Sequence, residues 1–186
     1  MLLGVSKTLR QRLLDAAPGI GSSGVEISNL QSDKPDGASA DKLILFLYAV
    51  SENRHLHNLP PDQLPDGRYR QAPLALTLHY LITYNSPDAE QGQPRLALVL
   101  RAFHSRARLG PSDLHQDIQN DVEGLTIRLR AMGSEELNQV WTALNVGMRP
   151  ALFYDVDLAL LEPFADVPLT PPVSDREARY LQGVES

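Results

Sequence analysis

Apolar and polar residues alternate most regularly between Pro73 and Tyr84, and this alternation predicts a β-strand. Successive side chains of a strand point to opposite faces of its sheet. One face of this strand is strongly apolar and comprises Leu74, Leu76, Leu78, Tyr80, Ile82 and Tyr84. The opposite face carries Thr77, His79 and Thr83 among apolar residues, so it is expected to meet different surroundings.

Four other segments have strand patterns. Residues 42–50 are apolar on both faces, which predicts a central strand. Short or half-exposed strands are predicted at 25–29 and 125–130, and a last strand at 151–161. One face of this last strand is apolar. Its other face carries Phe153, Asp155 and Asp157, so part of that face must meet water or a partner.

Three segments have the spacing of amphipathic helices. The first covers residues 2–17. The second follows a turn at 85–88, with Pro94 in its first turn. The third begins with Ser134 as its N-cap and ends at Gly147. The buried stripe of the second helix is predicted to be Leu96, Val99, Leu100 and Phe103, and that of the third Leu137, Val140, Trp141 and Leu144, with Trp141 interpreted as a core residue.

The remaining segments are predicted as loops or left open. Residues 31–40 are a polar loop, and 51–72 form a long loop of the kind that is usually functional or disordered. Residues 105–120 fit either a helical turn or a loop. We therefore expect one α/β (α+β) domain over residues 1–162, with a mixed or antiparallel central sheet of about four to five strands flanked by helices. A Pro-rich tail follows at 163–186, with a short helical pattern at 175–181.

Composition narrows the function classes. The chain has 186 residues and a formal net charge of −6, and no cluster of Lys and Arg offsets this balance, which argues against nucleic-acid binding. The absence of cysteine excludes disulfides, thiolate zinc sites and a cysteine nucleophile. No apolar run reaches the roughly 20 residues that span a membrane, and the first residues do not form a signal peptide. A cytoplasmic protein without a membrane segment is expected.

Few residues point to chemistry. His55 and His57 share one side of an extended segment, but two imidazoles do not complete a metal site, so solvated loop histidines are the better interpretation. His79 is interpreted as a structural or interface histidine, because no partner for a general base is visible. Asp155 and Asp157 are interpreted as edge-strand carboxylates or as contacts to basic groups of a neighbouring subunit. A small hydrolase using His79, or Asp155 and Asp157, is the least favoured alternative. No cofactor or metal is expected.

An ordered series of segments resembles one family over residues 3–161. It begins with Leu47-Tyr48, Asn53 and residues 56–61, and continues through the strand at 73–84. It then includes residues 96–104, 125–129, 134–137, 140–144 and 149–156. This series is similar to the cap, or tail-terminator, proteins of extracellular contractile injection systems. These are phage-tail-like particles of the antifeeding-prophage and virulence-cassette type.

The resemblance implies a structural role and no catalysis. A family member is expected to form a hexameric ring at the end of the particle distal to the baseplate. There it would stop growth of the inner tube and anchor the last ring of the contractile sheath. It would assemble in the cytoplasm and become part of the particle. The alternative is an adaptor for a cargo or baseplate component. The interface candidates are Arg54, His55, His57, Tyr69, Arg70, His79, Asp155 and Asp157.

Overall fold

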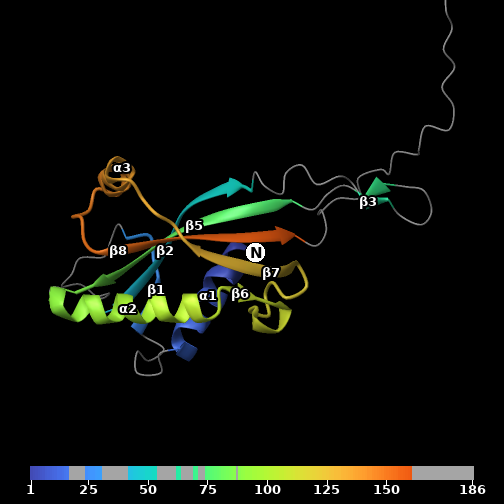
Figure 1. Ribbon diagram of the computed structural model, residues 1–186, viewed down its shortest axis with the longest axis horizontal. Coiled ribbons are helices and arrows are strands. Elements are labelled where there is room, and N and C mark those ends of the chain that lie inside the picture. Colours follow the sequence, from blue (N-terminus) through green and yellow to red (C-terminus); the bar gives the residue numbers. More distant parts are fainter. Residues whose placement is uncertain are drawn as a thin grey trace, which may run out of the picture.

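The predicted strand around His79 is β5 (Ala75–Asn85), which lies inside a six-stranded sheet in the computed structural model (Figure 1). The sheet is mixed: its first two strands are parallel and all other pairs are antiparallel. The strand order is β1 (Val25–Ile27), β2 (Lys42–Glu52), β5, β8 (Ala151–Leu160), β7 (Val122–Leu129) and β6 (Arg108–Leu109). The structure describes residues 1–16, 24–30, 42–53, 62–63, 69–70, 74–86 and 88–160.

Helices cover both faces of the sheet, as expected for a mixed α/β single domain (Figure 1). α1 (Leu2–Ala16) and α2 (Ala89–Ser105) lie on one face, and α3 (Ser134–Leu144) lies on the other. The sheet has one strand more than expected. The additional strand is β6, which falls in the segment at 105–120 that the sequence left open and is followed by one turn of 3-10 helix at Pro111–Asp113.

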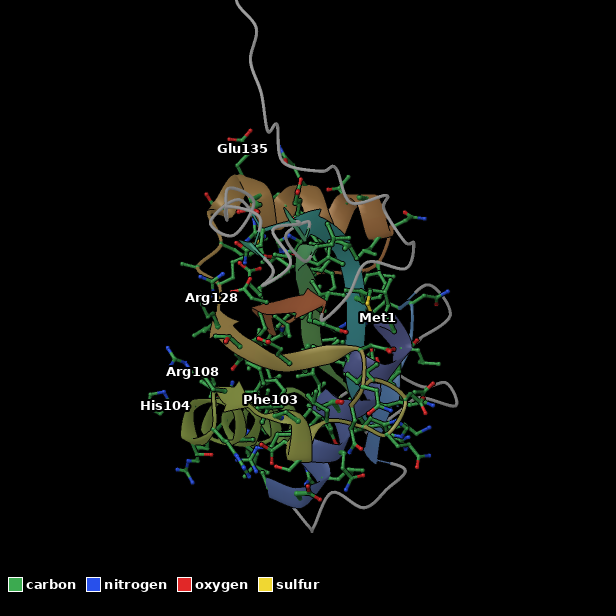
Figure 2. The ribbon with its side chains drawn as sticks, turned by 90° about the vertical axis from the view of Figure 1, so that its right-hand side faces the viewer. Met1, Phe103, His104, Arg108, Arg128 and Glu135 are labelled. Atoms are coloured by element: carbon green, nitrogen blue, oxygen red, sulfur yellow. The ribbon has the colours of Figure 1, made fainter. Side chains whose placement is uncertain are left out.

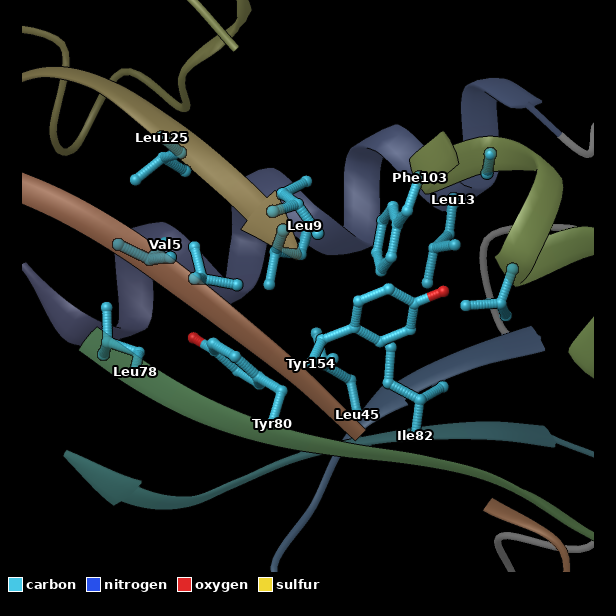
Figure 3. Packing of buried hydrophobic residues seen from close by; sticks show 14 of the residues in the cluster. Val5, Leu9, Leu13, Leu45, Leu78, Tyr80, Ile82, Phe103, Leu125 and Tyr154 are labelled. Atoms are coloured by element: carbon cyan, nitrogen blue, oxygen red, sulfur yellow. The ribbon is translucent and has the colours of Figure 1, made fainter. Parts of the chain in front are cut away.

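The larger core fills the space between the sheet and the helices α1 and α2 (Figure 3). The predicted apolar face of β5 supplies Leu78, Tyr80 and Ile82, and none of the three is exposed. Tyr80 lies fully inside this core, and its hydroxyl is 2.8 Å from Ser6 Oγ of α1. Leu74 was predicted to share this face, but it precedes the strand and is 48% exposed. The alternation therefore predicted the core correctly except at its first position.

A smaller core lies under α3. Trp141 packs there with Phe153 of β8, Leu81 of β5 and Ile44 of β2, all buried. The interpretation of Trp141 as a core residue is confirmed. The second face of β5 is therefore also covered over part of its length, which explains why Leu81 interrupts its polar residues.

The helix boundaries differ from the predictions because local hydrogen bonds decide them. α2 begins at Ala89, where the Asp88 side chain accepts a hydrogen bond from the Glu90 N–H, so Pro94 lies beyond the first turn. α3 has Gly133 at its N-cap and makes Ser134 its first helical residue. The same helix ends at Leu144, and Asn145 adopts a left-handed conformation (φ 53°) in place of an end at Gly147. Leu100 of α2 is 37% exposed and does not join the core.

The long segment between β2 and β5 was predicted as a loop, but part of it is paired. β3 (Asp62–Gln63) and β4 (Tyr69–Arg70) form a separate antiparallel pair. Residues 31–41, 54–61 and 161–186 lie outside the described residues, and so do the helical pattern predicted at 175–181 and the whole tail. The division into a domain at 1–162 and a tail at 163–186 stays a prediction.

Candidate interaction site

Strand pairing brings three of the predicted site residues together on the α3 side of the sheet. In the antiparallel register of β5 and β8, His79 is opposite Asp155 and Thr77 is opposite Asp157. Residues two apart on a strand share a face. His79 and Asp155 therefore continue the face that carries Leu81 and Phe153, beyond the apolar part under α3. The result is a polar row that leads from the small core towards the end of the sheet.

His79 is the centre of this row. Its Nδ1 atom lies 2.7 Å from Asp155 Oδ1 and 2.9 Å from Arg130 Nη1, while its Nε2 atom lies 2.8 Å from Ser51 Oγ. Arg130 also bonds Glu136, which belongs to the first turn of α3. The imidazole thus joins three strands, and Arg130 ties the sheet to α3.

Asp157 is held separately in the same row. Its two carboxylate oxygens accept hydrogen bonds from the Thr77 hydroxyl at 2.7 Å and from the Arg128 guanidinium at 2.7 Å. The interpretation of Asp155 and Asp157 as edge-strand carboxylates is wrong, because β8 lies between β5 and β7 and pairs with both. The basic groups that neutralise these carboxylates come from the same chain, mainly from β7 and the residue after it.

The hydrogen-bonded series Ser51, His79, Asp155 has the same residue types as the proton relay of serine hydrolases. In such a relay, Nδ1–H must be held by the carboxylate so that Nε2 can accept the serine proton. Here the Nδ1 atom of His79 has a competing donor in Arg130. When Nδ1 accepts from Arg130, Nε2 carries the proton and donates to Ser51, and the relay is not assembled. The geometry favours a structural hydrogen-bond network.

Tyr48 closes the network on the β2 side. Its ring lies 6.0 Å from the rings of both His79 and Phe153, measured between centroids. Burial raises the pKa of the Tyr48 phenol, an effect that Arg130 partly offsets. The hydroxyl has no hydrogen-bond partner in the described part of the chain. Tyr48 lies in the interruption of the β2–β5 register between Leu47 and Ala49, and so it is placed beside His79.

Sequence reasoning found His79, Asp155 and Asp157 but missed Ser51, Arg130 and Glu136. Ser51 is on β2 and Arg130 directly follows β7, two strands that are separated in the sheet by β5 and β8. Only the pairing of these four strands brings both residues to one imidazole. The one local signal is Glu136, which lies in the first turn of the third predicted helix, where the helix dipole favours carboxylates. No sequence pattern indicates that Arg130 is its partner.

The other predicted interface residues belong to the segment that leaves and re-enters the sheet beside this row. Ser51 pairs with Thr77, and β2 ends at Glu52, so the segment starts and finishes next to the Thr77–Asp157 pair. Arg54, His55 and His57 lie outside the described residues. For Tyr69 and Arg70 the structure describes the backbone of β4 and not the side chains. Their role as interface residues stays a prediction.

The sheet ends in two short edge strands. β1 has three residues, and beside it the exposed side chains of Leu2, Leu3 and Ile27 line a shallow groove with Phe46 and Leu47. β6, at the other edge, has two residues. In the described part of the chain, no cluster of three or more His, Asp or Glu side chains is placed to hold a metal ion. None of the described helices is long and apolar enough to cross a bilayer.

This fold is shared with two solved structures of proteins from extracellular contractile injection systems and a related prophage particle. The whole chain superimposes on 65% of the sheath/tube terminator of the PVC extracellular contractile injection system in its extended state, with a TM-score of 0.64 and 17% identity. The chain is also similar to the tube-terminating cap of the anti-feeding prophage, with a TM-score of 0.62 and 20% identity. This match covers 97% of the present chain and 62% of the cap protein. The chain therefore spans less than two thirds of either relative.

The family assignment comes from the sequence. The family model described as the Pvc16 N-terminal domain matches residues 4–175, and the chain belongs to this family. Comparison with curated protein sequences gives no significant match. The resemblance inferred from the order of the strands and the tryptophan helix is thereby confirmed.

Proposed function

We propose that this protein is the terminator cap of a contractile phage-tail-like particle, where it ends growth of the inner tube and anchors the last ring of the sheath. The observation that carries the proposal is the family match over residues 4–175, together with a fold shared with two solved terminators. In this role the protein would assemble in the cytoplasm as a ring of identical subunits, a hexamer, and would contact the tube protein and the sheath protein.

The sheet edges support this role. A terminator has to bind a repeating surface without templating another layer, and short edge strands limit unwanted strand addition. Edges of two and three residues meet this requirement. The two edges also differ from each other, and a contact of one edge with the opposite edge of the next copy would be head-to-tail, which closes a ring when the rotation per subunit is suitable.

The polar row around His79 supports a structural role and not a catalytic one. Its bonds fix α3 on the sheet and neutralise two carboxylates, leaving His79, Asp155 and Asp157 with 14%, 23% and 15% of their side chains exposed. A His79→Ala variant is expected to retain capping. A fluorophosphonate probe, which reacts with activated serines, is expected to leave Ser51 unlabelled. Labelling that disappears in His79→Ala would instead support a hydrolase.

The functional test is imaging of particles assembled with a labelled cap. Label at one end only, distal to the baseplate, is the expected result, and a deletion of the gene should give tubes of uncontrolled length or sheaths that detach. Label at the baseplate or inside the tube would indicate an adaptor. Purified protein that stays monomeric at high concentration, combined with a deletion that leaves particle length and sheath attachment unchanged, would refute the proposal.

A further inference from the structure

An apolar pocket opens between α2 and the strand β7, on the side of the sheet away from α3. Its volume is about 270 Å³. Leu129, at its mouth, is 59% exposed, and Leu100 is 37% exposed, although large aliphatic side chains are usually covered. Neither residue belongs to the larger core of this chain. The pocket is lined by Leu100, Phe103, His104, Ala107, Ile127, Leu129 and Tyr154.

Tyr154 lines this pocket with a buried ring and a hydroxyl that is not fully enclosed. The residue is 3% exposed, and its ring packs edge-on against Phe103 at 5.0 Å between centroids. Its hydroxyl makes no hydrogen bond to any other described residue and points towards α2 (Figure 3). Burial raises the pKa of Tyr154 to about 12, so the hydroxyl is a neutral donor at physiological pH. The hydroxyl therefore lies where a ligand group could accept its hydrogen bond in place of water.

The rim of the pocket is basic. His104 lines it directly, Arg101 lies three residues earlier on the exposed side of α2, and Arg108 lies on β6 next to β7. Figure 2 shows His104, Arg108 and Arg128 projecting from the same side of the molecule. Arg101, His104 and Arg108 have no ion-pair or hydrogen-bond partner in the described ranges, whereas Arg128 is held by Asp157. An occupant that complements this site has an apolar anchor flanked by carboxylates.

We propose that the pocket binds residues 161–170 of an adjacent copy, with Phe164 as the anchor. This inference rests on the proposed assembly of the protein into a ring. The segment reads Leu-Glu-Pro-Phe-Ala-Asp-Val-Pro-Leu-Thr and contains two carboxylates and no basic residue. Glu162 and Asp166 each lie two positions from Phe164, so an extended segment presents them on either side of the ring. They are placed to meet the basic rim, and an aromatic side chain suits a pocket floored by Phe103 and Tyr154.

Chain length favours a segment that comes from another copy. Tyr154 and Leu160 are both on β8, and six residues of strand span about 20 Å. Phe164 is four residues beyond Leu160, a distance that the fully extended chain covers in about 14 Å. Within one chain, Phe164 could therefore approach Tyr154 only if the chain reversed at Leu160 and ran back fully extended, which leaves about 6 Å between the two Cα atoms. Between copies related head-to-tail the limit does not apply, and each subunit would receive one segment and donate another.

The groove beside β1 is the other exposed apolar surface, and it is a poorer receptor for this segment. Its apolar residues Leu2 and Leu3 are accompanied by Glu26, which already pairs with Lys42 at 2.9 Å. An acidic segment would gain no unpaired cation from these lining residues. In the reverse arrangement, Leu3 entering the pocket would bring the amino terminus of α1 against a basic rim, which is unfavourable.

Disulfide trapping tests the contact directly, since the chain contains no cysteine. In the full-length double variant Leu129→Cys/Phe164→Cys, mild oxidation is expected to give a ladder of covalent species larger than a dimer, reversed by reductant. The matched control is Glu90→Cys/Phe164→Cys, because Glu90 is exposed at the opposite end of α2 and does not line the pocket. Single-cysteine variants cannot exceed a covalent dimer, so the ladder requires both positions.

A peptide provides an independent measurement. A synthetic peptide of residues 160–170 is expected to suppress the ladder and to bind the full-length protein, whereas the same peptide with Phe164→Ala should not. Tyr154→Phe keeps the apolar wall but removes the hydroxyl, and should weaken peptide binding by about fivefold, the value of one ordinary hydrogen bond. Raising the salt concentration should weaken binding further, since the rim contacts are ionic.

The outcomes separate this inference from the proposed function. A ladder with Leu129→Cys but not with Glu90→Cys supports the contact. An intrachain disulfide only, or equal ladders in both pairs, overturns it. A wild-type protein that forms rings while the Leu129 pair does not cross-link also overturns the contact and leaves the cap function intact. A protein that forms no ring at any concentration contradicts the self-association on which both depend.

Discussion

Gly4 of α1 is predicted to be required by a close approach to Ile118. A Cβ atom added at Gly4 would lie 2.3 Å from Cγ2 of Ile118, which has no exposed surface. Carbon atoms pack at about 3.5–4.0 Å, so one of the two segments must move. Gly4→Ala gains about 1 kcal/mol in helix propensity but incurs about 1–3 kcal/mol of overpacking. Because the contact is so short, we expect a net loss of about 1–2 kcal/mol of unfolding free energy.

The control is the same substitution in the other long helix. At Gly92 of α2 an added Cβ would lie 3.5 Å from Tyr84 Cδ1, an ordinary contact, so Gly92→Ala should stabilise the protein by about 0.5–1 kcal/mol. Urea unfolding followed by circular dichroism measures both changes, with unchanged m-values confirming comparable unfolding transitions. A Gly4→Ala variant as stable as Gly92→Ala would refute the reasoning.

A double-mutant cycle assigns the effect to Ile118. Ile118→Ala removes the clashing Cγ2 atom and on its own destabilises the protein by about 2–5 kcal/mol. In that background Gly4→Ala should become neutral or stabilising, because only the propensity gain and the filling of space remain. The coupling energy between the two sites should therefore be about 1–3 kcal/mol. Additive effects would mean that the loss in Gly4→Ala arises elsewhere.

Three further predictions concern the cores. Trp141→Ala should lower the unfolding free energy by about 3–5 kcal/mol, measured by circular dichroism, because the indole packs on Phe153 in the smaller core; a change below 1 kcal/mol would contradict this. Ser6→Ala should cost about 1–2 kcal/mol through the lost bond to Tyr80, and far less in a Tyr80→Phe background. Burial raises the pKa of Tyr80 and of Tyr154 to about 12 from 10.0. As the pH rises, the unfolded state therefore loses these protons before the folded state does. The contribution of the two tyrosines to the unfolding free energy should be fully present below pH 10 and should be lost between pH 10 and 12. Tyr80→Phe should reduce that slope in alkaline denaturation.

The sequence by itself determined the main strands, the three helices and the cores that they build. Alternation fixes which side of β5 is apolar, because the side-chain period of a strand is two, and Tyr80 and Ile82 are buried accordingly. Helical spacing likewise placed Trp141 in a core. The order of these elements was also sufficient to indicate the family, since the resemblance depends on sequence and not on contacts.

The tertiary structure decided everything that depends on which strands are neighbours. Pairing of β8 with both β5 and β7 converted Asp155 from a supposed edge carboxylate into the partner of His79 and Arg130. The same pairing placed Tyr154 at the floor of a pocket with Leu129 at its mouth. Periodicity says which face a residue occupies, but it cannot say what faces it, because contacts across a sheet join positions far apart in sequence. That information exists only once the sheet order is formed.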